Sequence, residues 1–213
     1  MKRSIALCVL GITTVCGMQA AHKTMHDAVG LVDVQEVNPN IRVKLYFATV
    51  DNFAGKTFYS DCAKAYLKSS AARALSAVQD ELEEMNLGLV VCDAYRPQSI
   101  QKALWECCPD QEYVVNPNVA CCRHHCGLAV DVMLVDLGNE SLLPMPCPFF
   151  GDPSMREYKS MPSAEGKRNC KLLELVMEKH GFVGLTTEWW HFDFKSRDLC
   201  DALDVSFEEL AQC

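Results

Sequence analysis

Residues 122–134 read CRHHCGLAVDVML, a polar segment with two histidines that passes through Gly127 into an apolar run containing one carboxylate, Asp131. The apolar run predicts a buried strand. A carboxylate buried there without a partner would be costly, so Asp131 is expected to face a cation. His124 lies seven residues before Asp131 and cannot share one face of a straight strand with it, which predicts a bend at Gly127.

A second segment, Glu188–Phe194, reads EWWHFDF and contributes a further histidine among aromatic side chains. His124, Asp131 and His191 together make a set of two imidazoles and one carboxylate, which leaves one position of a tetrahedral zinc ion open. An open position distinguishes a catalytic zinc from a structural one, because water or a substrate oxygen must bind there. We therefore expect one zinc ion per chain, bound by these three residues.

Two further side chains have the charge that amide hydrolysis needs. Zinc of this kind lowers the pKa of its bound water toward about 7. Glu188, three residues before His191, is the expected base that takes a proton from the attacking water and passes it to the departing amine. Negative charge develops on the carbonyl oxygen, and Arg96, in the turn at residues 93–97, is the expected cation that stabilises it.

Several segments of the chain resemble motifs of the zinc D-alanyl-D-alanine dipeptidases of the VanX type. They are residues 122–131 (S-x-H-x-x-G-x-A-x-D in the family), residues 188–192 (E-x-x-H), the arginine-bearing turn at 93–97, and the N-terminal stretches 51–55 and 65–67. The resemblance covers about residues 30 to 195. It implies hydrolysis of the dipeptide D-Ala-D-Ala to two D-alanines. The implied roles are zinc ligand for His124, Asp131 and His191, catalytic base for Glu188, and stabiliser of the tetrahedral intermediate for Arg96.

One position departs from the family motif. Cys122 stands where the family carries serine, and a thiol is a poorer hydrogen-bond partner than a hydroxyl. If that serine helps to hold substrate, affinity or selectivity differs in this chain. We expect Cys122, Tyr95 and Trp190 to contact the substrate.

Four alternatives remain open from the sequence. The first is a D,D-carboxypeptidase that trims peptidoglycan stem peptides, and the second is an inactive zinc-binding module of the same fold, as in the related hedgehog signalling domain. The third is a cysteine hydrolase that uses Cys122 or Cys126 beside His124. The fourth adds a second metal site to the zinc centre, made by Cys121, Cys122 and Cys126 with His125.

Strands and helices without a regular alternation predict a single α+β domain over residues 21–213, with a mostly antiparallel central sheet backed by helices and the zinc site on the sheet. The resemblance implies the hedgehog and D,D-peptidase type of fold. Strands are predicted at residues 41–47, 87–92, 182–183 and 188–194, and helices at about 62–85, 97–106 and 165–180 and near Phe207. The five prolines within residues 136–165 predict a long irregular segment, and such segments are often lids over active sites.

The net charge and the N-terminal sequence limit the possible binding partners and the cellular compartment. The net charge of -8 and the lack of a basic stripe argue against nucleic acid, and a small dipeptide is the expected partner. Lys2 and Arg3 precede an apolar run too short to span a bilayer, so residues 1–20 are predicted to be a signal peptide, with no stable membrane insertion. We expect export, to a periplasm; a cytoplasmic location is the alternative. The sequence does not define the oligomeric state.

Eleven cysteines follow residue 20, which suggests disulfides in an oxidising compartment. The doublets at residues 107–108 and 121–122 flank one loop, and a bridge across that loop is a hypothesis from their spacing.

Overall fold

A five-stranded sheet forms the centre of the computed structural model, in the strand order β2-β4-β5-β7-β6. The structure describes residues 29–111, 114–117, 122–146, 163–196 and 201–213. The strands are β2 (Arg42–Val43), β4 (Leu87–Asp93), β5 (Ala129–Asp136), β7 (His191–Phe194) and β6 (Phe182–Gly184). Only β2 and β4 pair in parallel, and the other three pairings are antiparallel. The prediction of a mostly antiparallel α+β fold is confirmed.

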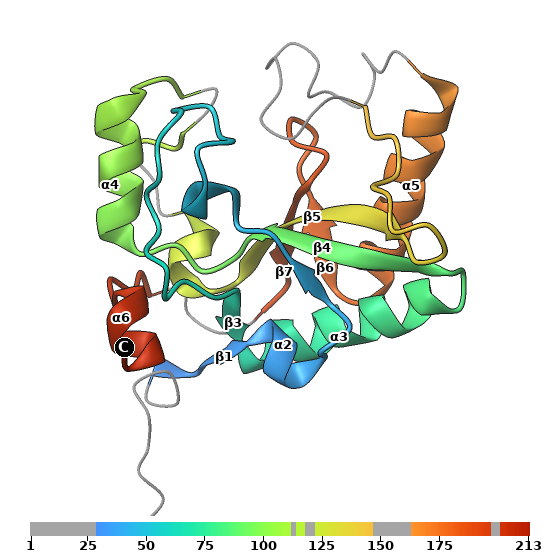
Figure 1. Cartoon of the computed structure of the whole chain (residues 1–213), viewed down its shortest axis with the longest axis horizontal. Coiled ribbons are helices and arrows are strands. Elements are labelled where there is room, and N and C mark those ends of the chain that lie inside the picture. Colours follow the sequence, from blue (N-terminus) through green and yellow to red (C-terminus); the bar gives the residue numbers. More distant parts are fainter. Residues whose placement is uncertain (1–28, 112–113, 118–121, 147–162, 197–200) are drawn as a thin grey trace, which may run out of the picture.

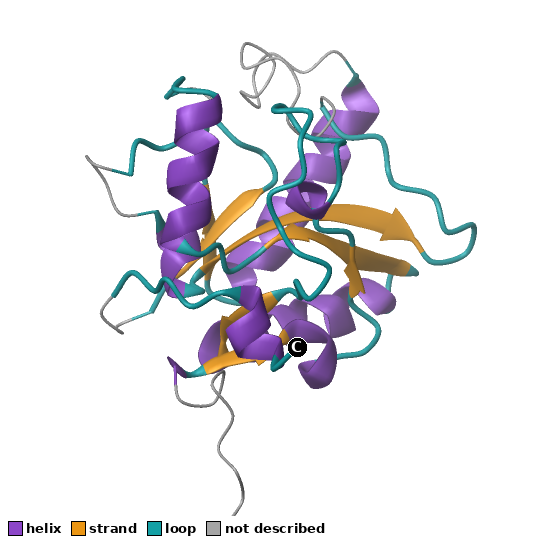
Figure 2. Cartoon of the chain, turned by 60° about the vertical axis from the view of Figure 1, so that its left-hand side comes forward, coloured by secondary structure: helices purple, strands orange, loops and turns teal. Residues whose placement is uncertain are grey.

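Helices surround this sheet on several sides. The helices are α2 (Val34–Val37), α3 (Ser69–Glu83), α4 (Gln98–Cys107), α5 (Ala164–Lys179) and α6 (Phe207–Ala211), with 3-10 turns η1 (Tyr46–Ala48) and η2 (Arg123–Cys126). In Figure 1, α4 and α5 stand on opposite sides of the molecule, the sheet crosses between them, and α3 runs beneath it. Figure 2 shows the same strands passing between helices after a turn of 60°. No helix in the described part of the chain has the length and apolar character needed to cross a bilayer.

The apolar pattern of the sequence explains the core. The central strands β4 and β5 are buried along almost their whole length, as expected for strands covered on both faces. Helices α3 and α5 pack against each other and against the sheet. Their core-facing residues recur at helical spacing: Leu75, Val78 and Leu82 on α3, and Leu173, Val176 and Met177 on α5.

Two predicted elements are shorter than expected. The helix predicted from residue 62 begins at Ser69, because Tyr66–Lys68 form strand β3, which pairs with β1 (Leu31–Asp33) in a separate two-stranded sheet. The strand predicted over 41–47 is reduced to Arg42–Val43. The chain then turns at η1, which buries Phe47 against the rings of Phe53, Phe58 and Tyr59. In both cases tertiary contacts override the local pattern.

The remaining predicted elements are confirmed within a few residues. Strand β7 begins only at His191, so Glu188 lies in the turn before it. Helix α5 is capped by the Ser163 hydroxyl, and α6 by a reciprocal pair between Ser206 and Glu209. The predicted signal peptide lies outside the described residues, as does most of the predicted lid, at 147–162.

The predicted disulfide across the 107–122 loop is wrong. Cys107 and Cys108 are free thiols at the end of α4, where Cys107 is exposed to solvent. The structure instead joins Cys62 to Cys213, which are 151 residues apart, and so ties the C-terminal end of the chain to the segment before β3. Cys121 lies outside the described residues.

The bend predicted at Gly127 is confirmed. Gly127 has φ +64° and ends η2 in the left-handed conformation, immediately before β5. A Cβ atom at this position would lie 2.5 Å from Leu31 Cδ2 and 3.1 Å from the backbone nitrogen of Lys68. Glycine is therefore required here both by the conformation and by the closeness of the neighbouring chain.

Substitution of Gly127 by alanine should destabilise the protein more than the backbone conformation alone requires. Gly55 offers a matched control, since its φ is +61° and a Cβ there meets nothing within 4 Å. Gly55→Ala is expected to cost about 1–2 kcal/mol, and Gly127→Ala roughly 1–3 kcal/mol more because of the steric clash. Urea unfolding of both variants measures the difference. Equal losses would contradict the close packing around Gly127.

Candidate active site

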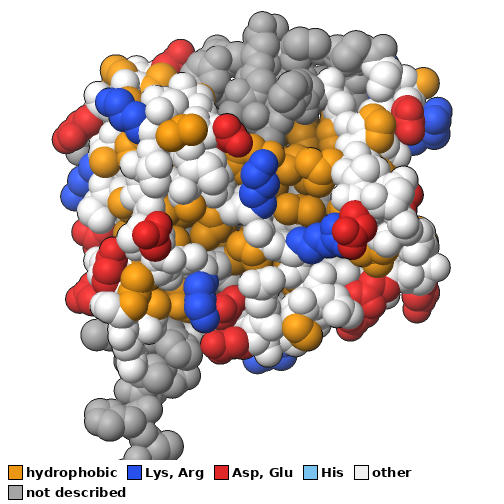
Figure 3. Space-filling view, viewed as in Figure 1, with side chains coloured by type: hydrophobic (Ala, Val, Ile, Leu, Met, Phe, Trp, Pro, Cys, Tyr) orange, Lys and Arg blue, Asp and Glu red, His pale blue; other side chains and the backbone are white. Residues whose placement is uncertain are grey.

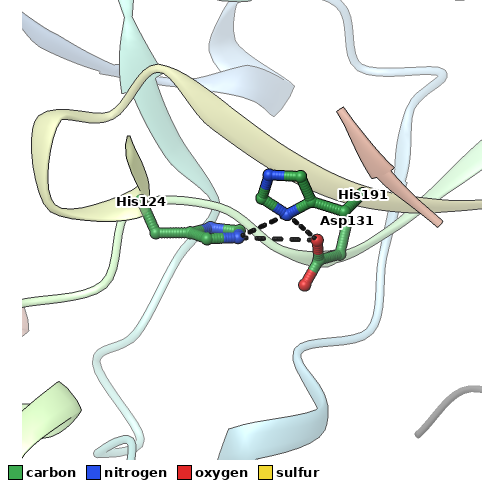
Figure 4. Close-up of side chains that lie close together, drawn as sticks. All are labelled: His124, Asp131 and His191. Carbon is green, nitrogen blue, oxygen red and sulfur yellow. Dashed lines mark hydrogen bonds and ion pairs between the residues drawn. The ribbon is translucent and has the colours of Figure 1, made fainter. Parts of the chain in front are cut away.

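His124, Asp131 and His191 converge in a buried cluster (Figure 4). His191 Nδ1 lies 3.0 Å from Asp131 Oδ1 and 3.2 Å from His124 Nε2. His124 Nε2 is 3.5 Å from the same carboxylate oxygen. The three ligand atoms lie within 4.8 Å of one another, so a single metal ion can contact all of them.

The sheet register places two of these residues side by side. Asp131 on β5 is directly opposite His191 on β7, and it is also the partner of Asp93 at the end of β4. Opposed residues of an antiparallel pair project from the same face of the sheet. His124 reaches the same point from η2, because the turn at Gly127 brings that segment back over the start of β5.

Both imidazoles are held with one nitrogen turned toward the cluster. His124 Nδ1 lies 2.6 Å from the carbonyl oxygen of Ala94, and His191 Nε2 lies 3.1 Å from Asp193 Oδ1. When these outer nitrogens carry the proton, Nε2 of His124 and Nδ1 of His191 present lone pairs to the centre. Such outer hydrogen bonds are a regular feature of zinc-binding histidines. The donor set and its orientation thus fit a zinc ion.

The electrostatics of the cluster keep Asp131 ionised. Burial alone would raise the pKa of this carboxyl, but the adjacent His124 and His191 outweigh burial and hold that pKa well below its usual value. Burial likewise opposes charge on His191, yet its hydrogen bonds to Asp131 and Asp193 raise its pKa well above the ordinary value. Asp131 is therefore in the deprotonated form that metal coordination requires.

The cluster lies at the side of a cavity of about 300 Å³. Its wall combines charged and apolar residues: Phe47, Phe53, Arg96, Leu104, Gln111, Val114, Val115, Cys122, Arg123, His124, Asp131, Leu185, Glu188, Trp190, His191 and Asp193. Figure 3 shows hydrophobic side chains gathered near the middle of the face viewed in Figure 1, with basic side chains beside them. Glu188 Oε2 lies 4.0 Å from His191 Nδ1, so this carboxylate is adjacent to the ligand cluster and also faces the cavity.

Arg96 also lines the cavity, and its guanidinium is fixed by three neighbours. Its Nε donates to Asp93 Oδ2 at 3.0 Å, and its Nη2 contacts the same oxygen. Its Nη1 donates to Gln101 Oε1 at 2.7 Å, and the ring of Phe47 lies 4.9 Å from its Cζ. Burial is the largest single effect and disfavours the charged form, but Asp93 together with Tyr59, Cys122 and Asp131 outweighs it, so that the pKa of Arg96 lies well above its usual value. A cation is thus held rigidly in the cavity wall.

Three residues that bond Arg96 or His191 were not predicted from the sequence: Asp93, Gln101 and Asp193. Asp93 is fully buried and accepts hydrogen bonds from Arg96 and from the Tyr59 hydroxyl at 2.6 Å. The argument that a carboxylate ending an apolar run needs a cation, applied above to Asp131, would have found it. Gln101 and Asp193 gave no comparable signal, because their contacts depend on tertiary packing.

The three residues expected to bind substrate lie in different environments. Cys122 and Trp190 line the cavity. Tyr95 is buried outside the cavity lining: its hydroxyl bonds the backbone oxygen and nitrogen of Val205, both at 3.0 Å, and its ring packs edge-on against Phe207. Tyr95 therefore secures the C-terminal segment, and its position gives no support to a role in substrate binding.

The cysteine-based alternatives receive no support from the structure. Burial raises the pKa of the Cys122 thiol, which opposes formation of a nucleophilic thiolate. Cys126 is disulfide-bonded and so is not available as a nucleophile or as a thiolate ligand. His125 Nδ1 bonds the carbonyl oxygen of Arg96 at 3.0 Å. Among the described residues, the only group with metal-binding geometry is the one formed by His124, Asp131 and His191.

Comparison with known proteins points to one family. The family model described as D-ala-D-ala dipeptidase matches residues 27–209. A D-alanyl-D-alanine dipeptidase of Escherichia coli is 37% identical over 171 residues, which cover 79% of this chain and 86% of the relative. A D-alanyl-D-alanine dipeptidase of Streptomyces coelicolor is 29% identical over 182 residues, which cover 76% of this chain and 90% of the relative. Among solved structures, that of the LdcB LD-carboxypeptidase is similar to this chain with a TM-score of 0.45 and 19% sequence identity. The match covers 79% of this chain and 69% of that chain.

Replacement of Gln101 by leucine should impair hydrolysis through Arg96. The substitution removes the acceptor for Arg96 Nη1 and the donor to the Val115 carbonyl, a bond of 2.7 Å. Buried groups without partners should lower stability by about 1–3 kcal/mol, and the loosened guanidinium should lower kcat roughly 10- to 100-fold. Gln79→Leu is the control, since Gln79 is equally buried and bonds Leu89 and Glu83 elsewhere. Similar kcat values for the two variants at matched stability would contradict a link between Gln101 and the site.

Proposed function

The chain belongs to the D-ala-D-ala dipeptidase family, and on that basis we propose that it hydrolyses free D-Ala-D-Ala to two molecules of D-alanine, with one zinc ion held by His124, Asp131 and His191. The family match over residues 27–209 makes it a zinc metallopeptidase. The names of its relatives in Escherichia coli and Streptomyces coelicolor support the dipeptide as substrate. The convergence of the three ligand atoms within 4.8 Å is the structural observation that carries the proposal.

The ligand residues provide an arrangement suited to a catalytic metal. Two imidazole nitrogens and one carboxylate oxygen satisfy three coordination positions and leave a fourth for water or substrate. Zinc, when bound, supplies a Lewis acid that activates water and polarises a carbonyl group. Trp190, which is almost fully buried, forms an apolar part of the cavity wall, and an apolar wall strengthens the electrostatic interactions beside it.

We assign Glu188 the role of proton carrier. Its carboxylate faces the cavity and lies beside the ligand cluster, 4.0 Å from His191 Nδ1. There it can accept a proton from the attacking water and then donate that proton to the nitrogen of the departing D-alanine. The turn before β7 places Glu188 beside the ligands without making it one of them.

Arg96 is the residue that stabilises the developing negative charge. A guanidinium has five N–H groups. Hydrogen bonds to Asp93 and Gln101 engage Nε, Nη1 and Nη2, and the Tyr59 side chain is a further hydrogen-bond neighbour of the guanidinium. The guanidinium lines the cavity, so its positive charge lies close to the carbonyl oxygen of a substrate bound there. Because the guanidinium is already fixed, little reorganisation is needed as the charge forms.

The cavity favours a small substrate. A volume of about 300 Å³ is at the lower end of the range for small-molecule sites. This volume is compatible with a free dipeptide, and the names of the relatives favour that substrate over the longer stem peptide of a D,D-carboxypeptidase. Cys122 and Trp190, which line the cavity, remain our candidates for direct substrate contacts.

Glu188→Gln should abolish most of the activity while leaving the metal in place. The amide keeps the size of the side chain but cannot carry the proton, so kcat for D-alanine release should fall by roughly 10²- to 10⁴-fold. Zinc content, measured by metal analysis, should match that of the parent. Removal of zinc with a chelator should inactivate the parent, and added zinc should restore it. A fully active variant would end the assignment of Glu188.

The matched substrate comparison uses a peptidoglycan pentapeptide that ends in D-Ala-D-Ala. The dipeptide is expected to give the higher kcat/KM. A pentapeptide hydrolysed as well as the dipeptide would instead identify a carboxypeptidase, and chelator-resistant activity that thiol alkylation destroys would restore the cysteine hydrolase.

We also propose that the chain is exported, with residues 1–20 as a cleaved signal peptide and a periplasmic location. The Cys62–Cys213 disulfide supports an oxidising compartment. Cell fractionation and N-terminal sequencing of the purified protein should find a mature chain that starts near residue 21. A full-length chain recovered from the cytoplasm with Cys62 and Cys213 reduced would support the cytoplasmic alternative.

A further inference from the structure

Asp193 stands on the side of His191 away from the ligand cluster. The two residues are separated by one position on β7 and so lie on the same face of the strand. Asp193 Oδ1 is 3.1 Å from His191 Nε2, whereas Asp131 Oδ1 is 3.0 Å from Nδ1 of the same ring. The imidazole is therefore held between two carboxylates, and only Asp131 belongs to the set that can bind metal.

Arg123 forms an ion pair with Asp193. Its Nε lies 3.7 Å from Asp193 Oδ1, and its Nη2 donates to the carbonyl oxygen of Phe194 at 2.6 Å. Arg123 immediately precedes His124, so the pair connects the η2 turn that carries one ligand with the β7 strand that carries another. Both side chains are about 30% exposed at the cavity wall, so neither is required to fill the core.

We propose that Asp193 is a positioning residue for the metal centre and that Arg123 holds Asp193 in place. By accepting the Nε2 proton, Asp193 selects the tautomer in which Nδ1 of His191 presents its lone pair to the ion. It also fixes the angle of the ring, which would otherwise be set only by backbone and packing. The inference rests on the proposed zinc site but not on the identity of the substrate.

The direct test is zinc affinity, measured by competition with a chromophoric chelator on purified metal-free protein. Asp193→Ala should weaken zinc binding roughly 10- to 100-fold, the usual effect of losing such an outer partner. Asp193→Asn keeps a hydrogen-bond acceptor but not the charge, so its affinity should lie between those of Asp193→Ala and the parent. Thermal unfolding of the metal-free proteins should give similar midpoints.

Glu174→Gln is the matched control. The Glu174 side chain is 35% exposed and pairs with Lys171 at 2.7 Å on α5, so it resembles Asp193 in exposure and pairing but is not part of the site. Its zinc affinity should stay within twofold of the parent. Arg123→Gln should weaken zinc binding by less than Asp193→Ala does, because it removes only the support for Asp193. This variant keeps the test valid if the Asp193 variants fail to fold.

Zinc affinity within twofold of the parent in folded Asp193→Ala would overturn the proposal. If KM for the dipeptide rose in that variant while zinc affinity held, Asp193 would be a substrate contact instead. If the Asp193 variants do not fold, unchanged zinc affinity in Arg123→Gln would also overturn the proposal. A parent protein that binds zinc but releases no D-alanine would refute the proposed function and leave this inference standing.

Discussion

The antiparallel pairing of β5 with β7 is the constraint on which the rest of the site depends. It places Asp131 opposite His191, and the pairing of β4 with β5 adds Asp93 to the same row. A slip of one residue in either pairing would turn these side chains to the opposite face of the sheet. The buried apolar residues that alternate with them fix the register, so the hydrophobic core that stabilises the fold also determines the position of the residues that can hold a metal ion.

Two buried carboxylates, Asp131 and Asp93, lie next to each other on this face of the sheet, each beside nitrogen-bearing side chains. Asp131 faces His124 and His191, while Asp93 faces Arg96, and His124 Nδ1 lies 3.9 Å from Asp93 Oδ2. Burial of any one of these charges alone would cost several kcal/mol. Their mutual pairing offsets much of that cost. Tyr59 and Ala94 also donate hydrogen bonds to Asp93, and Gln101 accepts one from Arg96. The two carboxylates therefore have different partners: Asp131 belongs to the group that can hold a metal ion, and Asp93 fixes the cation in the cavity wall.

The sequence was sufficient to predict that His124, Asp131 and His191 converge and that the chain bends at Gly127. Each of these has a local signature: a carboxylate inside an apolar run, a histidine flanked by aromatic residues, or a glycine before a strand. It was not sufficient for β3, Gln101, Asp193 or the Cys62–Cys213 bridge. These features arise from contacts between segments far apart in the chain, and no local pattern encodes them. Tyr95 illustrates the same limit, since its place in an arginine-bearing motif suggested substrate while its hydroxyl bonds Val205.

The C-terminal segment shows how far such long-range contacts support the site. The backbone nitrogen of Leu203 donates to the carbonyl of His125, and that of Gln98 donates to the carbonyl of Leu203, so this segment crosses behind both the η2 turn and the start of α4. Phe207 packs against Tyr59 and Tyr95, and the disulfide at Cys213 closes the segment onto Cys62. Residues 203–213 therefore contact His125 and Gln98, which lie close in sequence to His124 and Arg96. Because the ligands come together only in the folded chain, zinc binding should stabilise the same contacts that create its site.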